Sequence, residues 1–132
     1  MERTIKFRGK SIYNDEWLYG YLIKLDEDRY AVVPVINDIE PGKCLSMFEV
    51  YIDTVGQFTG ICDKNWKEIY EGDILFVGEE DDIKVYNKVG IKDGCFGYIG
   101  EISGELIPFY ESEVTAVIVG NICDNPELLK GE

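Results

Sequence analysis

The chain has 132 residues, 45% of them hydrophobic and 30% charged, a composition that predicts a folded protein of one domain or two small lobes. Its 26 acidic and 13 basic residues give a net charge of −13, which argues against a general nucleic-acid backbone binder, because such binding needs clustered lysine and arginine. The absence of histidine removes every triad or dyad built on that residue within one copy.

Alternating apolar residues predict β-strands along most of the chain. The predicted strands are residues 5–8, 17–25, 30–36, 49–55, 57–61, 68–70, 74–77, 83–91, 95–99 and 114–122. Pro34 marks an edge strand or a bulge. Turn-forming side chains in residues 62–67 predict a hairpin between the strands on either side.

The clearest helix signal lies at the C-terminus, where Pro126 would be the first helical residue after Asp124 or Asn125 as cap. It predicts one or two turns that dock Leu128 and Leu129 on a sheet. Many short strands with glycine-rich turns indicate a mainly β protein, either a sandwich or small barrels. We place the boundary between an N-terminal and a C-terminal lobe near Gly56.

The four cysteines are far apart in the sequence: Cys44, Cys62, Cys95 and Cys123. They lack the paired spacing of zinc sites. The first ten residues contain no apolar signal region, and no apolar run approaches the roughly 20 residues of a membrane span. We therefore expect a cytoplasmic protein with four reduced thiols, mostly buried as small hydrophobic groups, with no metal, no cofactor and no membrane contact.

The middle of the chain resembles the signature block of the YopX family. The matching segments, in family order, are residues 5–8 (IKFR), 54–60 (TVGQFTG), 63–65 (DKN), 67–74 (KEIYEGDI), 119–122 (VGNI) and 125–129 (NPELL). The sequence departs from the family pattern at Trp66, where members tend to have glycine. Because an indole takes a positive φ less cheaply than glycine, we expect the turn to differ locally or Asn65 to take the left-handed position.

The resemblance implies a small phage- or prophage-encoded protein of a bacterial host, with no established activity. It also implies a mainly β fold: a small β-lobe over residues 1–55, and an SH3-like barrel lobe over 56–132 that ends in a short C-terminal helix. The two lobes together would form one compact YopX-like unit, with the barrel strands between about residues 68 and 122. No catalytic residue is carried over from the family.

Residues 56–73 are the first candidate for a functional surface. A structural interpretation accounts for all of them, since the glycines suit tight turns and the aromatics suit a core. The alternative is a partner surface. Its residues would be Gln57, Thr59, Trp66, Glu71 and Asp73. Glu68 or Asp73 could in principle pair with another acid in hydrolysis, but sequence does not give the separation of the carboxylates, and we do not favour this interpretation.

Two acidic runs, residues 79–82 and 26–28, could attract calcium or magnesium. Their spacing is not that of a calcium loop, so we interpret both as solvated hairpin tips. Tyrosine and tryptophan are numerous, which suits a core together with an oligomer interface. These residues are Trp17, Tyr19, Tyr21, Tyr30, Tyr51, Trp66, Tyr70, Tyr86, Tyr98 and Tyr110.

We interpret the protein as a non-catalytic accessory protein rather than an enzyme, acting as an interaction or assembly module. Its expected partner is a further copy of itself, and a host or phage protein is a second option. The main alternative is an acidic mimic of nucleic acid that occupies a basic host protein, since a charge of −13 would attract a basic cleft. A carboxylate–metal hydrolase is the third and least favoured reading.

Overall fold

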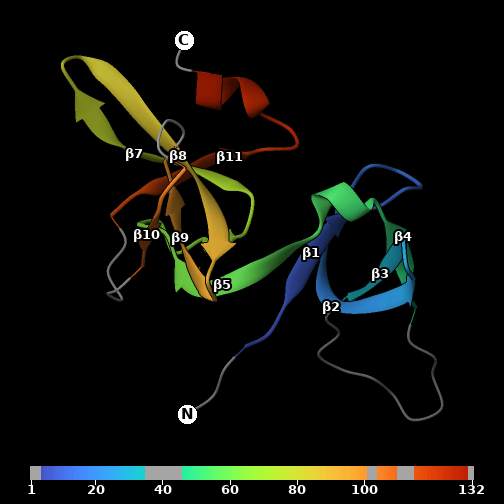
Figure 1. Ribbon diagram of the computed structural model, residues 1–132. Coiled ribbons are helices and arrows are strands. Elements are labelled where there is room, and N and C mark those ends of the chain that lie inside the picture. Colours follow the sequence, from blue (N-terminus) through green and yellow to red (C-terminus); the bar gives the residue numbers. More distant parts are fainter. Residues whose placement is uncertain (1–3, 35–45, 101–103, 110–114, 131–132) are drawn as a thin grey trace. The chain divides into compact units, whose positions relative to one another are not determined.

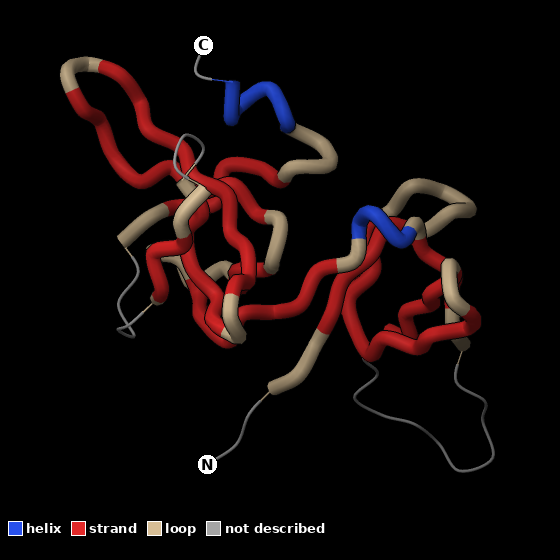
Figure 2. The backbone as a smooth tube through the Cα atoms, in the orientation of Figure 1, coloured by secondary structure: helices blue, strands red, loops and turns tan. Residues whose placement is uncertain are grey.

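The computed structural model describes residues 4–34, 46–100, 104–109 and 115–130 (Figure 1). The chain divides into two compact units, Met1–Phe58 and Thr59–Glu132. In the described residues almost all regular structure is β, in two antiparallel sheets (Figure 2). The predicted mainly β class is therefore confirmed.

Most of the strands are short. They are β1 (Phe7–Lys10), β2 (Trp17–Asp26), β3 (Arg29–Pro34), β4 (Phe48–Val50), β5 (Gly56–Cys62), β6 (Glu68–Tyr70), β7 (Asp73–Glu80), β8 (Ile83–Lys92), β9 (Cys95–Ile99), β10 (Leu106–Pro108) and β11 (Val117–Asn121). Two 3-10 turns accompany them, η1 (Ile52–Thr54) and η2 (Pro126–Lys130).

The first sheet has the strand order β4-β3-β2-β1-β5-β6, and β5 runs from the first unit into the second. In the first unit, the last residue of β4, Val50, forms an isolated β-bridge with Ser11, the residue that follows β1. The Tyr51 N–H donates to the Lys10 carbonyl at 2.9 Å. Gly9 permits this approach, because a Cβ there would lie 2.8 Å from a methyl group of Val50.

The second sheet has the order β10-β9-β8-β7-β11 and lies wholly in the second unit. The core of the second unit is a cluster of four buried residues, Ile69, Leu75, Val89 and Ala116, with Ile61, Tyr98, Phe109 and Ile118 packed around them. The rings of Tyr98 and Phe109 meet edge to face, with their centroids 4.8 Å apart. The core therefore joins β6, β7, β8 and the start of β11.

The structure differs from the predicted elements at several places. The predicted strand 49–55 ends at Val50, because η1 follows, and β10 was not predicted. The predicted C-terminal helix is only the 3-10 turn η2. Among the described residues, the edge strands β10 and β11 do not pair with each other, so the second sheet is open where the expected SH3-like barrel would close. Residues 35–36, Val114, Tyr110 and Cys44 lie outside the described part of the chain.

Within the described ranges, the structure contains no helix with the length and apolar character needed to cross a lipid bilayer.

Candidate functional site

The turn between β5 and β6, residues 63–67, presents the most exposed large hydrophobic side chain that the structure describes. The indole of Trp66 is 86% exposed. Its backbone has a φ of 66°, in the left-handed region that favours glycine. Of the two alternatives expected for this turn, the one that places Asn65 in the left-handed position is therefore wrong. Trp66 takes the costly conformation itself.

Asp63 forms the base of this turn, and its side chain is only 4% exposed. One carboxylate oxygen, Oδ1, accepts hydrogen bonds from the backbone N–H groups of Asn65 at 2.8 Å and Lys67 at 2.9 Å. The Asp63 N–H donates to the Lys67 carbonyl at 2.8 Å, and the Trp66 N–H donates to the Asp63 carbonyl at 3.0 Å. Both ends of the turn are therefore held by one residue.

The same residue ties the turn to β11. Asp63 Oδ2 accepts the Ile118 N–H at 3.0 Å, and the Lys64 N–H donates to the Ala116 carbonyl at 3.1 Å. Burial acts to raise the pKa of Asp63, but the three N–H donors and the charge of Lys67 outweigh it and hold this pKa below its ordinary value. The indole of Trp66 is thus displayed from a turn anchored on the core of the second unit.

The other residues of the predicted partner surface have different environments. The Thr59 hydroxyl donates to the Ile69 carbonyl at 2.9 Å. Asp73 is 2% exposed, and its carboxylate accepts the Tyr70 N–H at 2.7 Å. Glu71 is half-buried in the turn between β6 and β7, and Gln57 is half-buried on β5, opposite Phe7 in the first unit. Trp66 is the member of the set with a fully exposed side chain.

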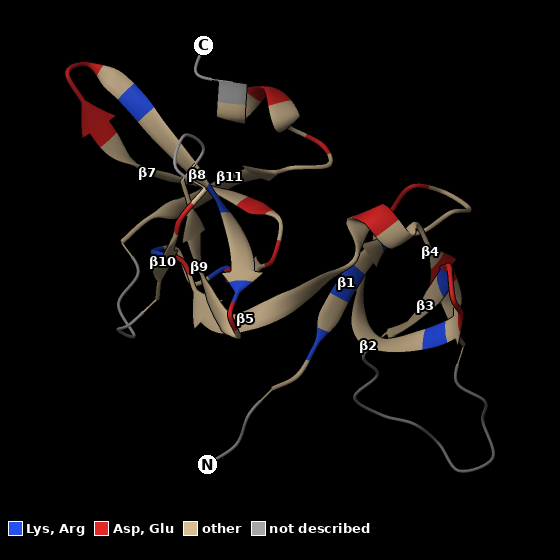
Figure 3. Ribbon diagram, in the orientation of Figure 1, with Lys and Arg blue, Asp and Glu red and all other residues tan. Residues whose placement is uncertain are grey.

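The carboxylates considered for chemistry are tied to structural partners. Glu68 accepts a hydrogen bond from the Tyr70 hydroxyl at 3.1 Å, while Asp73 binds the backbone of the same tyrosine. Residues 79–82 are exposed at the tip of the β7–β8 hairpin, as predicted, and residues 26–28 at the tip of β2–β3 (Figure 3). In the part of the chain that is described, no three Asp, Glu or Cys side chains gather in an arrangement able to hold a metal ion.

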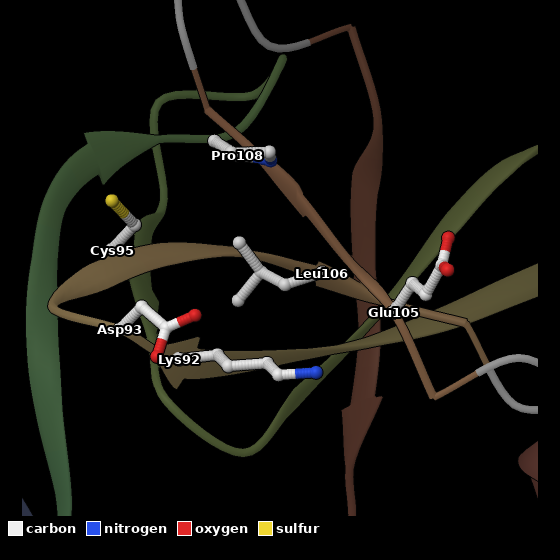
Figure 4. A pocket seen from close by; sticks show the side chains of 6 residues that line it. All are labelled: Lys92, Asp93, Cys95, Glu105, Leu106 and Pro108. Atoms are coloured by element: carbon white, nitrogen blue, oxygen red, sulfur yellow. The ribbon is translucent and has the colours of Figure 1, made fainter.

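Sequence reasoning missed an open pocket of about 350 Å³ in the second unit, between the β8–β9 turn and β10 (Figure 4). The apolar side chains of Leu106 and Pro108 line it. Around them lie four exposed side chains: Lys92, Asp93, Cys95 and Glu105. The turn did have a sequence signal, because an Asp-Gly pair is typical of two-residue hairpin turns. In the structure Asp93 and Gly94 both have the positive φ that such a turn requires, at 53° and 80°. The position of β10 beside it had no local signal.

The cations near the N-terminus contact aromatic rings of the first unit. The Arg8 guanidinium lies 4.7 Å and the Lys10 ammonium 5.7 Å from the centre of the Trp17 ring, and the Lys6 ammonium lies 5.4 Å from that of Phe58. These contacts stabilise the first unit, and two of them are made by Trp17, one of the aromatic residues considered for an oligomer interface.

The expected burial of the thiols is wrong for two of the cysteines. Cys95 and Cys123 are exposed and Cys62 is half-buried. None of these three described cysteines is joined in a disulfide, and Cys44 lies outside the described residues.

Comparisons with known proteins place the chain in a family. No curated protein matches it. The crystal structure of protein EF1440 from Enterococcus faecalis is similar in fold, with a TM-score of 0.58 and 24% identity, over 97% of this chain and 99% of that one. The sequence model of the YopX protein family matches residues 6–130, nearly the whole length. The chain therefore belongs to the YopX protein family.

Proposed function

We propose that the protein is a non-catalytic interaction module of a phage or prophage, and that it assembles with further copies of itself through the 63–67 turn. The observation that carries this proposal is the 86% exposure of the Trp66 side chain. The proposal includes a location in the cytoplasm of the bacterial host, in keeping with the exposed thiols of Cys95 and Cys123.

Two costs at one position support a contact role for Trp66. A non-glycine residue at a φ of 66° costs about 1–2 kcal/mol relative to a right-handed one. An exposed indole adds the cost of apolar surface left in water. Neither the left-handed backbone nor the exposed indole stabilises the fold of the single copy. Tryptophan is, however, among the residue types most enriched at the hot spots of protein interfaces.

The turn is also built as a rigid platform. Asp63 holds its two ends and links it to β11, so that the orientation of the turn is determined before any partner arrives. A preorganised backbone loses little conformational freedom on binding, and this increases affinity for a given contact area.

The proposal is tested by sedimentation velocity on the wild type, Trp66→Gly and Trp66→Ala, from about 1 μM to about 1 mM. We expect the wild type to associate as concentration rises and both variants to stay monomeric, with unchanged circular dichroism. Glycine suits the backbone of this position, so the loss of association in Trp66→Gly would not reflect a damaged fold. A wild-type chain that stays monomeric throughout, or a Trp66→Gly variant that associates like the wild type, would contradict the proposal.

The proposal extends to an SH3-like arrangement of residues 56–132, which the family resemblance implies. Two β-bulges support it, one in β7 between Phe76 and Gly78 and one in β11 between Ile118 and Gly120, because bulges bend strands as a small barrel requires. NMR cross-peaks between β10 and β11 would test it, and their absence in a fully assigned spectrum would count against a closed barrel.

A second candidate function is that of an acidic mimic of nucleic acid. It is favoured by the net charge of −13 and by the exposed acids of residues 79–82 on the β7–β8 hairpin (Figure 3). Its test is binding to a purified basic DNA-binding protein of the host. We would expect DNA to compete, affinity to fall steeply with salt, and Glu79→Lys/Glu80→Lys to weaken the complex. Binding that ignores both salt and DNA would eliminate this candidate.

A further inference from the structure

We infer that the Trp66 side chain of one copy is received by the pocket lined by Leu106 and Pro108 on a second copy. This inference rests on the proposed self-assembly and names the surface that accepts the turn. The indole and the pocket belong to the same unit of the chain. Trp66 is not part of the lining of the pocket of its own copy, and its exposure shows that the indole lies in solvent there.

The pocket suits one large side chain. Its volume of about 350 Å³ is near the lower end of the roughly 300–1,000 Å³ range of ligand-binding pockets. In Figure 4 the Leu106 side chain lies at the centre of the lining, with Pro108 and Cys95 to one side, so the middle is apolar and the charged groups lie around it. An indole placed against Leu106 and Pro108 would remove apolar surface from water on both copies.

The charges around the two surfaces are complementary. Two exposed lysines flank the indole, Lys64 and Lys67. The rim of the pocket carries two carboxylates, Asp93 and Glu105, against a single lysine, Lys92. This charge pairing favours the same relative orientation of the two copies as the apolar contact does, with the lysines of the turn beside the acids of the rim.

The complementarity within one chain is what identifies the partner as a second copy. Copies with a net charge of −13 repel one another at long range, so association requires a local contact of opposite sign. The 63–67 turn is such a region, because its exposed lysines stand on a chain with twice as many acids as bases. The contact joins two different surfaces, so each copy offers both a donor turn and an acceptor pocket.

The test uses the native cysteines as reporters. Cys95 lines the pocket, whereas Cys123 is also exposed but does not line it, and so serves as the matched control in the same molecule. The rate of alkylation of each thiol by a maleimide is followed by mass spectrometry on dilute and concentrated protein. When nine-tenths of the pockets are filled, Cys95 should react about tenfold more slowly, while Cys123 keeps its rate. In Trp66→Gly the protection of Cys95 should vanish.

A charge exchange provides the second measurement. Lys64→Glu and Glu105→Lys should each weaken association, and an equal mixture of the two variants should restore it, because the reversed charges then face each other. If Trp66→Gly loses association but Cys95 of the wild type reacts equally fast at all concentrations, the pocket is not the acceptor of the indole, while the proposed assembly stands. A Trp66→Gly variant that associates normally would overturn the assembly itself. If the mixture of the two variants does not associate, the proposed pairing of Lys64 with Glu105 is wrong.

Discussion

Trp66 shows how a single residue can oppose the local preference of its own turn. Glycine is the residue that fits a φ of 66° without steric cost, and the family resemblance points to glycine at this position. The indole is held there by the hydrogen bonds of its neighbours, since Asp63 accepts from the N–H groups on both sides of Trp66. The strain is thus maintained by a buried carboxylate, and strain that persists in this way is typical of functional positions.

Comparing two variants isolates the backbone strain. Trp66→Gly and Trp66→Ala both remove the indole, but only glycine relieves the left-handed conformation. We expect Trp66→Gly to be more stable than Trp66→Ala by about 1 kcal/mol in urea unfolding at a concentration where the protein is monomeric. Equal stability of the two variants would mean that the turn relaxes to another conformation in solution.

Asp63 gives a prediction with a defined pH dependence. Asparagine can accept the N–H groups of Asn65 and Lys67, but its amide would place a donor against the Ile118 N–H, so Asp63→Asn should lower the free energy of unfolding by about 2 kcal/mol at pH 7. The folded pKa of Asp63 lies below its ordinary value. Its stabilisation is therefore complete above the ordinary pKa of about 4 and is lost as the pH falls through the folded pKa.

The measurement is urea unfolding of the wild type and Asp63→Asn from pH 7 down to the acid limit of folding. The difference between them should shrink below about pH 4, as the wild-type carboxylate becomes protonated. Asp81→Asn is the matched control, because it removes the same charge from an exposed hairpin tip, and it should change stability little. A constant gap between wild type and Asp63→Asn at every pH would contradict the role of the ionised carboxylate.

At the scale of elements, each unit pairs a strand-ending proline with a glycine. Pro34 of β3 lies opposite Gly20 of β2, and Pro108 of β10 lies opposite Gly97 of β9. A Cβ at Gly20 would lie 2.0 Å from the Val33 carbonyl oxygen, and one at Gly97 would lie 2.2 Å from that of Ile107. In both sheets the backbone before the proline approaches the partner strand so closely that only glycine fits.

This arrangement predicts that Gly97 is essential for the position of β10, and so for the pocket. Gly97→Ala should cost about 3 kcal/mol, because a backbone carbonyl cannot move aside without breaking the strand pairing. Gly90 faces Gly97 across β8 and β9, but a Cβ there would meet the end of the Ile99 side chain, which can rotate. Gly90→Ala should therefore cost only about 1 kcal/mol.

Hydrogen exchange distinguishes local from global effects of these substitutions. In Gly97→Ala the amides of β10 should lose protection while those of β7 and β11 keep it, whereas Gly90→Ala should leave β10 protected. Retention of β10 protection in Gly97→Ala would show that the strand shifts without separating.

Alternation predicted the two long strands over residues 17–25 and 83–91 correctly, because long hairpins contain enough positions to reveal the period. Burial does not follow this alternation, however, since Tyr19, Tyr21 and Ile23 are exposed whereas Gly20 between them is buried. Strand β10 escaped because it has three residues, and its place beside β9 depends on a glycine distant in sequence. The strand predicted over residues 49–55 failed because η1 interrupts it, with the Thr54 N–H bonded to the Tyr51 carbonyl.

The candidate site was predictable to a similar degree. The block around Trp66 stood out by its resemblance and its turn residues, and the indole proved to be exposed. The anchoring role of Asp63 was not visible in the sequence, because one of its three donors, Ile118, is 55 residues away. The pocket was equally hidden, since its lining joins the β8–β9 turn to β10 across a long-range contact.

At the scale of the whole molecule, the charge is unusual both in its size and in what is missing. The net charge is −13, yet no histidine is present to titrate near neutral pH. The ordinary pKa values of the side chains that do occur lie near 4 for the acids or above about 8 for cysteine, tyrosine and the bases. Folded and unfolded chains should therefore bind the same number of protons over a broad range around pH 6.

By linkage, the free energy of unfolding should be flat between about pH 5.5 and 7, because its slope equals the difference in bound protons between the two states. Below about pH 4 it should fall, as Asp63 becomes protonated. Urea midpoints measured at half-unit steps of pH check this directly, with the slope of the transition as a control for two-state behaviour. A marked slope inside the plateau would reveal a carboxylate whose folded pKa is raised into the neutral range. Such a carboxylate would be a new candidate for a functional group of this protein.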